Sequence, residues 1–399
     1  MDRILLDPRA WGVMLAAMLT IMSNATITPA LPGLQAMFSD NPRAELLTRL
    51  LITAPSLAVA IIAPFAGVMT DRLGRRKPLF TGLIIYALAG TAGLYLHSLE
   101  AILASRVVLG VGVAAIMTAQ AALIGDYFTG PERGRLMGYQ IAAVNMGGLI
   151  FVMTAGFLAQ RDPQLPFLIY GLSILLFPIL WKLLPEPPKT ISGAGEAVGA
   201  ERGEPGWPRT VATMATAAML SFVIFYSIPT QVPYFLAEIG LSDARYAGEV
   251  MGSMMVAAAL MAVVSGWIRP YLGRIGTPVT GYMLLAAGFA GMATGHSLIM
   301  AMASTALIGA GLGLCLPTFV ITALNASPAD KRGLVSGFVT SSFFLGQFLS
   351  PIVSTPLVAS FGYQKTFAIA AVGCVVLAAL LAVTIRKRPA AVDRPGPAH

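Results

Sequence analysis

Long apolar runs constrain this chain more than any other feature. Twelve stretches are each about as long as the 20 or so residues that an α-helix needs to cross a bilayer. Charged residues make up only 11% of the chain, against about 25% in soluble domains. The runs are continuous and rich in Ala, Leu, Gly and Met, unlike the alternating strands of a membrane β-barrel. We predict an all-α polytopic membrane protein with spans at 10–34, 46–70, 77–97, 99–126, 133–160, 165–184, 210–238, 246–270, 276–296, 298–325, 332–360 and 364–386.

The distribution of Lys and Arg predicts the orientation of these spans. Twelve spans place both termini on one side, and most of the 26 Lys and Arg lie on that side. Lys and Arg concentrate on the cytoplasmic side of membrane proteins. We therefore expect cytoplasmic termini, in the inner membrane of a bacterial cell. Because topology accounts for the net charge of +8, we expect no nucleic-acid partner. We also expect the protein to work in the lipid bilayer as a monomer.

The chain repeats itself at an offset of 199 residues. This shift lays Leu73-Gly74-Arg75 on Leu272-Gly273-Arg274, and His97-Ser98-Leu99 on His296-Ser297-Leu298. We predict two six-helix halves in a parallel pseudo-symmetric repeat, an arrangement in which one half can rock against the other around a central site. The predicted parts are a first half at 1–184, a flexible cytoplasmic linker rich in Pro, Gly, Ala and Glu at 185–209, a second half at 210–386 and a tail at 387–399.

Five charges fall in the short turn GVMTDRLGRRKP between the second and third spans. A positively charged cytoplasmic turn needs no function beyond setting topology. The order of its residues, however, resembles the signature of the major facilitator superfamily at this loop. Arg106-Val-Val-Leu-Gly110-Val-Gly112 in the fourth span is similar to a second motif of that family. The resemblance covers essentially the whole chain and implies the twelve-helix fold of the family.

The resemblance also implies a cytoplasmic latch between the halves. In it, Arg75 pairs with an acid at the end of the fourth span, where Asp126 lies, and Asp71 faces the N-terminus of the eleventh helix, where a carboxylate is favourable. The repeat maps Asp71 to Pro270 and Asp126 to Asn325, so the second half lacks both acids. This joint loss fits one charge network. We expect it to steady the outward-facing state through Gly67, Asp71, Arg72, Gly74, Arg75, Arg76 and Asp126.

Two charged residues are candidates for coupling or substrate binding. Arg106 lies inside the fourth span, where an unpaired arginine costs about 2.5 to 3.5 kcal/mol, so it is a functional candidate by default. The alternative is a structural arginine held by backbone carbonyls or a neighbouring helix. Glu249 lies near the outer end of the eighth span. No Asp or Glu lies at mid-membrane, and Ser23 and Asn24 stand where many proton-coupled exporters of the family have an acid.

In this family the first, fourth, seventh and tenth helices line a central cavity, and polar or adaptable side chains recur along these spans. For each of them, ordinary hydrogen bonding between helices is the alternative to substrate contact. The fifth and eleventh spans add one candidate each. The predicted cavity residues are Asn24, Thr28, Met117, Gln120, Asn145, Phe222, Tyr226, Thr318 and Gln347.

Pro29-Ala-Leu-Pro32 in the first span is similar to a pattern of the drug and proton antiporter group. The resemblance favours a proton-coupled exporter of small amphipathic molecules, such as drug-like compounds, sugars or siderophore-like metabolites. Such an exporter works by rocker-switch alternating access, with the proton gradient as energy source and no cofactor. Gly147-Gly148 in the fifth span lacks the proline of the antiporter signature. This keeps open an uptake permease or uncoupled facilitator for a small organic anion or metabolite, and a non-transporting sensor is a third reading.

An enzyme is not expected. The chain shows no arrangement of Ser, His and acid for nucleophilic catalysis, no His and Cys spacing for a metal, and no phosphate-binding loop.

Overall fold

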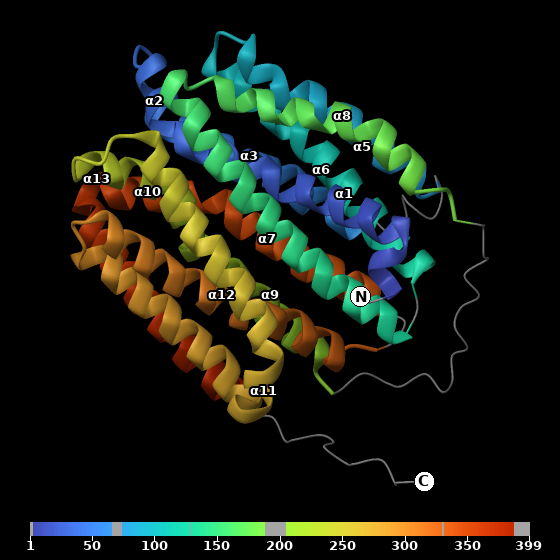
Figure 1. Cartoon of the computed structure of the whole chain (residues 1–399). Helices are drawn as coiled ribbons and strands as arrows, with labels where there is room; N and C mark the ends of the chain where they lie inside the picture. The colour runs from blue at the N-terminus through green and yellow to red at the C-terminus, as the bar shows by residue number, and fades with distance from the viewer. Residues whose placement is uncertain (1–2, 66–73, 129, 188–204, 329–330, 387–399) are drawn as a thin grey trace, which may run out of the picture.

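Every regular element in the described part of the chain is helical, which confirms the predicted fold class (Figure 1). The computed structural model describes residues 3–65, 74–128, 130–187, 205–328 and 331–386. Its α-helices are α1 (Pro8–Ala25), α2 (Leu31–Met37), α3 (Ala44–Ile62), α5 (Arg76–Gly90), α6 (Leu99–Tyr127), α7 (Gly130–Arg161), α8 (Leu172–Leu183), α9 (Trp207–Phe225), α10 (Ser227–Glu238), α11 (Ala244–Thr294), α12 (Leu298–Ala326) and α13 (Arg332–Arg386).

These helices supply the twelve predicted crossings. Within the described residues, 11 helical segments are long and apolar enough to span a membrane, and the last of them runs over 52 residues of α13. Gly362, with φ of 77°, interrupts α13 and divides it into two crossings. Gly273, with φ of 66°, divides α11 in the same way. Both turns use glycine because a residue without a Cβ adopts positive φ without strain.

The internal repeat of the sequence is also a repeat of local structure. The hydroxyls of Ser98 and Ser297 accept the backbone N–H of the third residue of α6 and α12 respectively, each at 3.3 Å. Gly74 has φ of 80°, and Gly273, its equivalent at the 199-residue offset, also has positive φ. Equivalent residues therefore cap and turn equivalent helices in the two halves, which lie side by side in Figure 1.

Glycines let helices within each half approach very closely. A Cβ at Gly110 would lie 2.2 Å from the carbonyl oxygen of Pro55, so α6 packs directly on the backbone of α3. Its equivalent in the repeat, Gly309, would place a Cβ 2.1 Å from the carbonyl oxygen of Met254, so α12 packs on α11. Small residues at such crossings are typical of helix packing in membranes.

The halves meet mainly along two helix pairs, α3 with α13 and α7 with α11, and α10 adds contacts to α2 and α3. We call the end of the bundle where α5 and α9 begin and α8 ends the linker end. The opposite end, where α3, α6 and α11 begin, is the far end. Near the far end, a Cβ at Gly248 would lie 3.2 Å from the carbonyl oxygen of Val152, so α7 and α11 are in close contact there.

The connection between the halves begins in contact with the first half. Glu186, inside the predicted linker of 185–209, is hydrogen-bonded to the start of α5. At the other end of that stretch, α9 already begins at Trp207. The rest of the predicted linker (188–204), the predicted tail at 387–399 and three residues of the predicted latch, namely Gly67, Asp71 and Arg72, lie outside the described residues.

Candidate functional site

A cavity of two adjoining lobes lies between the halves. The larger lobe has a volume of about 220 Å³ and is lined from α1, α3 and α7 of the first half and from α9, α10, α11 and α12 of the second. The smaller lobe, of about 150 Å³, is lined from α1, α3, α6, α7, α9 and α13. The lobes share Ile21, Asn24, Phe222 and Tyr226.

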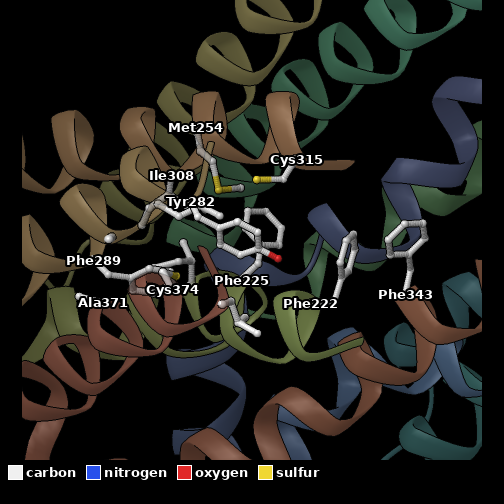
Figure 2. Packing of buried hydrophobic residues seen from close by; sticks show 14 of the residues in the cluster. Phe222, Phe225, Met254, Tyr282, Phe289, Ile308, Cys315, Phe343, Ala371 and Cys374 are labelled. Carbon is white, nitrogen blue, oxygen red and sulfur yellow. The ribbon is translucent and has the colours of Figure 1, made fainter. Parts of the chain in front are cut away.

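The lining is apolar with a few neutral polar groups. Three methionines, Met251, Met254 and Met255, line the larger lobe beside Phe225. Met254 and Phe225 belong to a buried cluster formed mainly by the second half, in which Figure 2 also shows Tyr282 and Phe289. No Asp, Glu, Lys, Arg or His is present among the described residues that line either lobe. Concave apolar sites with a few oriented polar groups are typical of small-molecule binding.

Most of the predicted cavity residues lie in this lining. Thr28 and Asn145 line the larger lobe, and Met117 and Gln347 line the smaller one. Asn24, Phe222 and Tyr226 line both. The rings of Phe222 and Tyr226 are stacked, with centroids 5.8 Å apart, and form an aromatic wall at the junction of the lobes.

Two predicted cavity residues lie elsewhere. Gln120 is buried, and its Nε2 donates to the Val13 carbonyl oxygen at 3.1 Å, so it joins α6 to α1. Thr318 has its hydroxyl 3.5 Å from the Leu314 carbonyl of its own helix. Met117 lines the smaller lobe although it lies only three residues before Gln120, so neighbouring positions of α6 meet the cavity and α1 respectively.

Arg106 also lies away from the cavity. Its side chain is fully buried, and Nη2 donates to the Gly90 carbonyl oxygen at 2.7 Å. The guanidinium carbon lies 4.7 Å from the ring centre of Phe167 and 4.6 Å from that of Tyr170, which are cation–π distances. These partners all belong to the first half. The contacts match the structural alternative for this residue: an arginine held by a backbone carbonyl and by neighbouring rings.

Glu249 is engaged on its own helix. Its Oε1 lies 2.7 Å from Nε of Arg245, one turn earlier in α11. It lines neither lobe of the cavity.

The described part of the predicted latch forms a charge cluster at the linker end. Nε of Arg75 lies 2.9 Å from Oδ2 of Asp126, the contact that the resemblance implied. Arg76 stacks its guanidinium 4.2 Å from the ring centre of Trp181. Glu186 accepts the backbone N–H of Arg75 at 2.8 Å and that of Arg76 at 3.0 Å. A carboxylate placed on free N–H groups at the start of a helix is stabilising.

Glu186 was missed at the sequence level because its segment, Pro185-Glu186-Pro187, matched the composition of the linker. Its signal is the position of a single acid directly after the sixth span. A carboxylate there reaches the turn that precedes the third span, since both lie at one end of the bundle.

A second cluster, which we call the far-end cluster, joins the halves through Arg49. This side chain is only 2% exposed, and it reaches from α3 to α10 and α13. Its Nε donates to Gln231 Oε1 at 2.9 Å, and its Nη2 donates to the Tyr363 hydroxyl at 3.3 Å. The guanidinium lies 4.2 Å from the ring centre of Tyr234. Glu45, one turn earlier on α3, supplies the counter-charge at 2.9 Å.

Arg49 was also missed, because the sequence placed it among the cations at the outer edge of a span. Its signal is the pair Glu45 and Arg49 at one-turn spacing, together with Gln231 inside the seventh span. A long polar side chain within a span needs a partner from another helix.

One further polar contact joins the halves at the far end. Gln160, near the end of α7, donates to Oδ1 of Asp243, the N-cap of α11, at 2.5 Å. Asp243 also accepts the backbone N–H of Arg245 at 2.8 Å. These hydrogen bonds, the backbone one first, lower the pKa of Asp243 below its ordinary value of 3.8.

The chain matches a family model described as Major Facilitator Superfamily over residues 13–351, with a second match over 279–399. Among curated proteins, it is 23% identical over 320 residues to the quinolone resistance protein NorA of Staphylococcus aureus (strain MRSA252), covering 77% of this chain and 80% of that protein. It is 23% identical over 391 residues to the multidrug transporter protein MdtP of Bacillus subtilis (strain 168), covering 84% and 71%.

Solved structures share the fold. A D-xylose-proton symporter aligns with a TM-score of 0.76 at 18% identity, over 94% of this chain and 96% of that one. A bacterial homolog of the human lysosomal transporter Spinster, inward-facing and unoccupied, aligns with a TM-score of 0.75 at 18% identity, over 95% and 96%. The fold implied by the sequence motifs is confirmed.

Proposed function

As the chain belongs to the major facilitator superfamily and is a multi-pass membrane transporter rather than an enzyme, we propose that it is a proton-coupled exporter of small amphipathic molecules. The observation that carries the proposal is the apolar cavity with walls from both halves. The names of its relatives, a quinolone resistance protein and a multidrug transporter, favour export. The multidrug relatives also favour a substrate with an apolar body.

The two end clusters support alternating access as the mechanism. The Lys and Arg distribution assigns the linker end to the cytoplasm. The far-end cluster, which joins the halves through Arg49, then closes the cavity on the outside. The latch at the linker end closes it on the inside, and the two closures alternate during a transport cycle.

Proton coupling is the part of the proposal that the cavity itself does not supply, because no carboxylate is present among its described lining residues. We assign it to Asp126 at the linker end, whose negative charge holds Arg75. The Asp126→Asn variant removes this ion pair at the start of α5. Coupling on this proposal acts through the Arg75–Asp126 contact.

The proposal is tested in inverted membrane vesicles energised by a proton gradient and monitored with a pH-sensitive dye. Lipophilic cations, sugars and uncharged aromatic compounds are added in turn, and at least one of these classes is expected to dissipate the proton gradient. The Asp126→Asn variant is expected to lose this response. Labelled compounds that equilibrate across the membrane without any proton flux would falsify proton coupling and establish a facilitator instead.

The facilitator is the second candidate because the described cavity lining contains no acid. An organic-anion permease that uses Arg106 as its anion site has no such support, since Arg106 is held inside the first half, away from the cavity.

A further inference from the structure

Three polar side chains of the smaller lobe each have a buried atom without a hydrogen-bond partner among the described residues. We call Asn24, Ser56 and Gln347 the polar subsite; they come from α1, α3 and α13. Gln347 and Ser56 are each 1% exposed. Nε2 of Gln347, Oγ of Ser56 and Oδ1 of Asn24 are buried atoms without a hydrogen bond to any described residue.

Such atoms are unusual because about 90% or more of buried polar groups in proteins have a partner. Two other buried glutamines of this chain follow the rule. Gln120 donates to the Val13 carbonyl oxygen, and Gln231 accepts from Arg49 and donates to Ser354 at 2.8 Å. Of these three fully buried glutamines, the one with an unpartnered atom is the one that lines the cavity, whereas the partly buried Gln35, whose Oε1 also lacks a partner, lies on α2 at the far end. We therefore expect the missing partner of the cavity glutamine to be a bound ligand. A glutamine that only joined helices would be hydrogen-bonded to a neighbouring helix, as Gln120 and Gln231 are.

The polar subsite requires a ligand group that both accepts and donates. An amide side chain carries one acceptor oxygen and two N–H donors, and it can turn to present either. As placed, Asn24 offers the acceptor Oδ1 and Gln347 offers the donor Nε2, and the pair still offers one acceptor and one donor if both amides turn together. A carboxamide or a hydroxyl, which also has both functions, satisfies them together, whereas an ether or a tertiary amine does not.

The rest of the cavity selects against charge. The larger lobe is lined by Met251, Met254 and Met255 together with the stacked rings of Phe222 and Tyr226. Methionine and aromatic side chains adapt to flat apolar bodies. No charged residue in the described lining could compensate a ligand charge. Desolvation of such a charge without a partner is strongly unfavourable.

We infer that the transported molecule is uncharged, with an aromatic or apolar body in the larger lobe and one group that donates and accepts hydrogen bonds, such as a carboxamide, in the polar subsite. This inference rests on the proposed transport function for its biological meaning. The binding step itself requires no gradient, so it can be measured separately.

Binding is measured by equilibrium dialysis on the full-length protein in lipid nanodiscs, with three labelled probes of similar size. The probes are 1-naphthamide, its N,N-dimethyl derivative, which lacks the donor, and 1-naphthylmethylammonium, which carries a positive charge. We expect 1-naphthamide to bind about tenfold more tightly than the dimethyl derivative, the effect of about one hydrogen bond. The ammonium is expected to bind more weakly than either.

The variants Gln347→Met and Asn24→Leu are expected to weaken 1-naphthamide binding about tenfold and to remove its advantage over the dimethyl derivative. Because Gln347→Met replaces an unpartnered polar group by an apolar one of similar length, it should also raise the melting temperature of the ligand-free protein. The matched control is Gln120→Met, which loses a protein hydrogen bond. It should lower the melting temperature and leave the preference among probes unchanged.

Three results would overturn the inference. The first is no saturable binding of 1-naphthamide, and the second is binding of the ammonium as tight as that of the amide. The third is a lower melting temperature of Gln347→Met, which would give that side chain a protein partner. Failure of the proposed function is a different outcome: 1-naphthamide binds with the expected preference, but no proton flux accompanies its transport in vesicles.

Discussion

Arg49 and Arg106 are both fully buried, yet their partners differ in origin. Arg106 contacts Gly90, Phe167 and Tyr170, all of the first half. Arg49 reaches from the first half to Gln231 and Tyr363 of the second. A residue whose partners move with it contributes to the stability of one half. A residue whose partners lie across the boundary responds to the relative position of the halves.

Arg106→Lys is expected to lower the stability of the protein and to leave substrate affinity unchanged. The ammonium keeps the charge but loses the planar stacking between the rings of Phe167 and Tyr170, a loss of about 1 to 3 kcal/mol. Thermal unfolding in detergent and probe binding in nanodiscs check the two parts. A stable variant that binds normally but has lost proton coupling would instead give Arg106 a coupling role.

Asp243 allows a prediction about pH. Its pKa is lowered by hydrogen bonds to its carboxylate, so its ionised form favours the folded contact. The stabilisation is present above the unfolded pKa and is lost only as pH falls through the still lower folded value. The contact with Gln160 is therefore constant between about pH 5 and 8, where histidine and not aspartate ordinarily titrates.

We accordingly expect Asp243→Asn, which keeps a good N-cap residue, to leave the midpoint of the pH profile of transport in place. The profile is measured as initial rates in proteoliposomes of fixed internal pH. A midpoint displaced in this variant would place a coupling proton at the far end.

Among the helices, close packing through glycine is the feature most open to test. Gly110→Ala would place its Cβ 2.2 Å from the carbonyl oxygen of Pro55 and force α6 away from α3. We expect a loss of about 1 to 3 kcal/mol in unfolding free energy, as for other overpacked sites. Gly138→Ala in α7 is the control, because nothing lies within 4 Å of a Cβ there. It should be neutral or stabilising by up to about 1 kcal/mol. Equal effects would remove close packing as the explanation.

The sequence predicted where helices lie better than which neighbours their faces meet. Apolar runs, the caps at Ser98 and Ser297 and the turns at glycine are local signals, so the spans agree with the structure to within a few residues. The cavity residues Asn24 and Gln347 followed from the resemblance. The environments of Arg106 and Gln120 did not, because they depend on which residues of α5, α1 and the segment Leu165–Gly171 meet α6. The role of Arg49 depends on residues more than 180 positions away.

For the whole molecule, the two ends of the bundle differ in how they are closed. At the far end, Arg49 and the contact of Gln160 with Asp243 join the halves directly. At the linker end, the described charge cluster of Arg75, Asp126 and Glu186 lies within the first half. The halves are also joined toward the linker end by Ser341, which donates to the Ala60 carbonyl oxygen at 2.7 Å.

Arg49→Gln is expected to open the far end. The variant loses the bonds to Gln231 and Tyr363 across the boundary, so a cysteine introduced at Ser354, which is 4% exposed beside Gln231, should react faster with a membrane-impermeant maleimide applied from outside. We expect an increase of about five- to thirtyfold, since one or two kcal/mol of closure is lost. Arg161→Gln, an exposed change in the same region, is the control. An unchanged labelling rate would mean that Arg49 does not hold the halves together.

The clamp of Glu186 on the start of α5 has a mechanical consequence. Pro187, the next residue, is the last described residue before the connection to the second half. Tension along the connection is therefore transmitted to the N-terminus of α5, where Arg75 and Asp126 meet, before it reaches the end of α8. A movement of the second half that pulls on the connection would therefore act at the same place as the loss of the ion pair between Arg75 and Asp126, the start of α5.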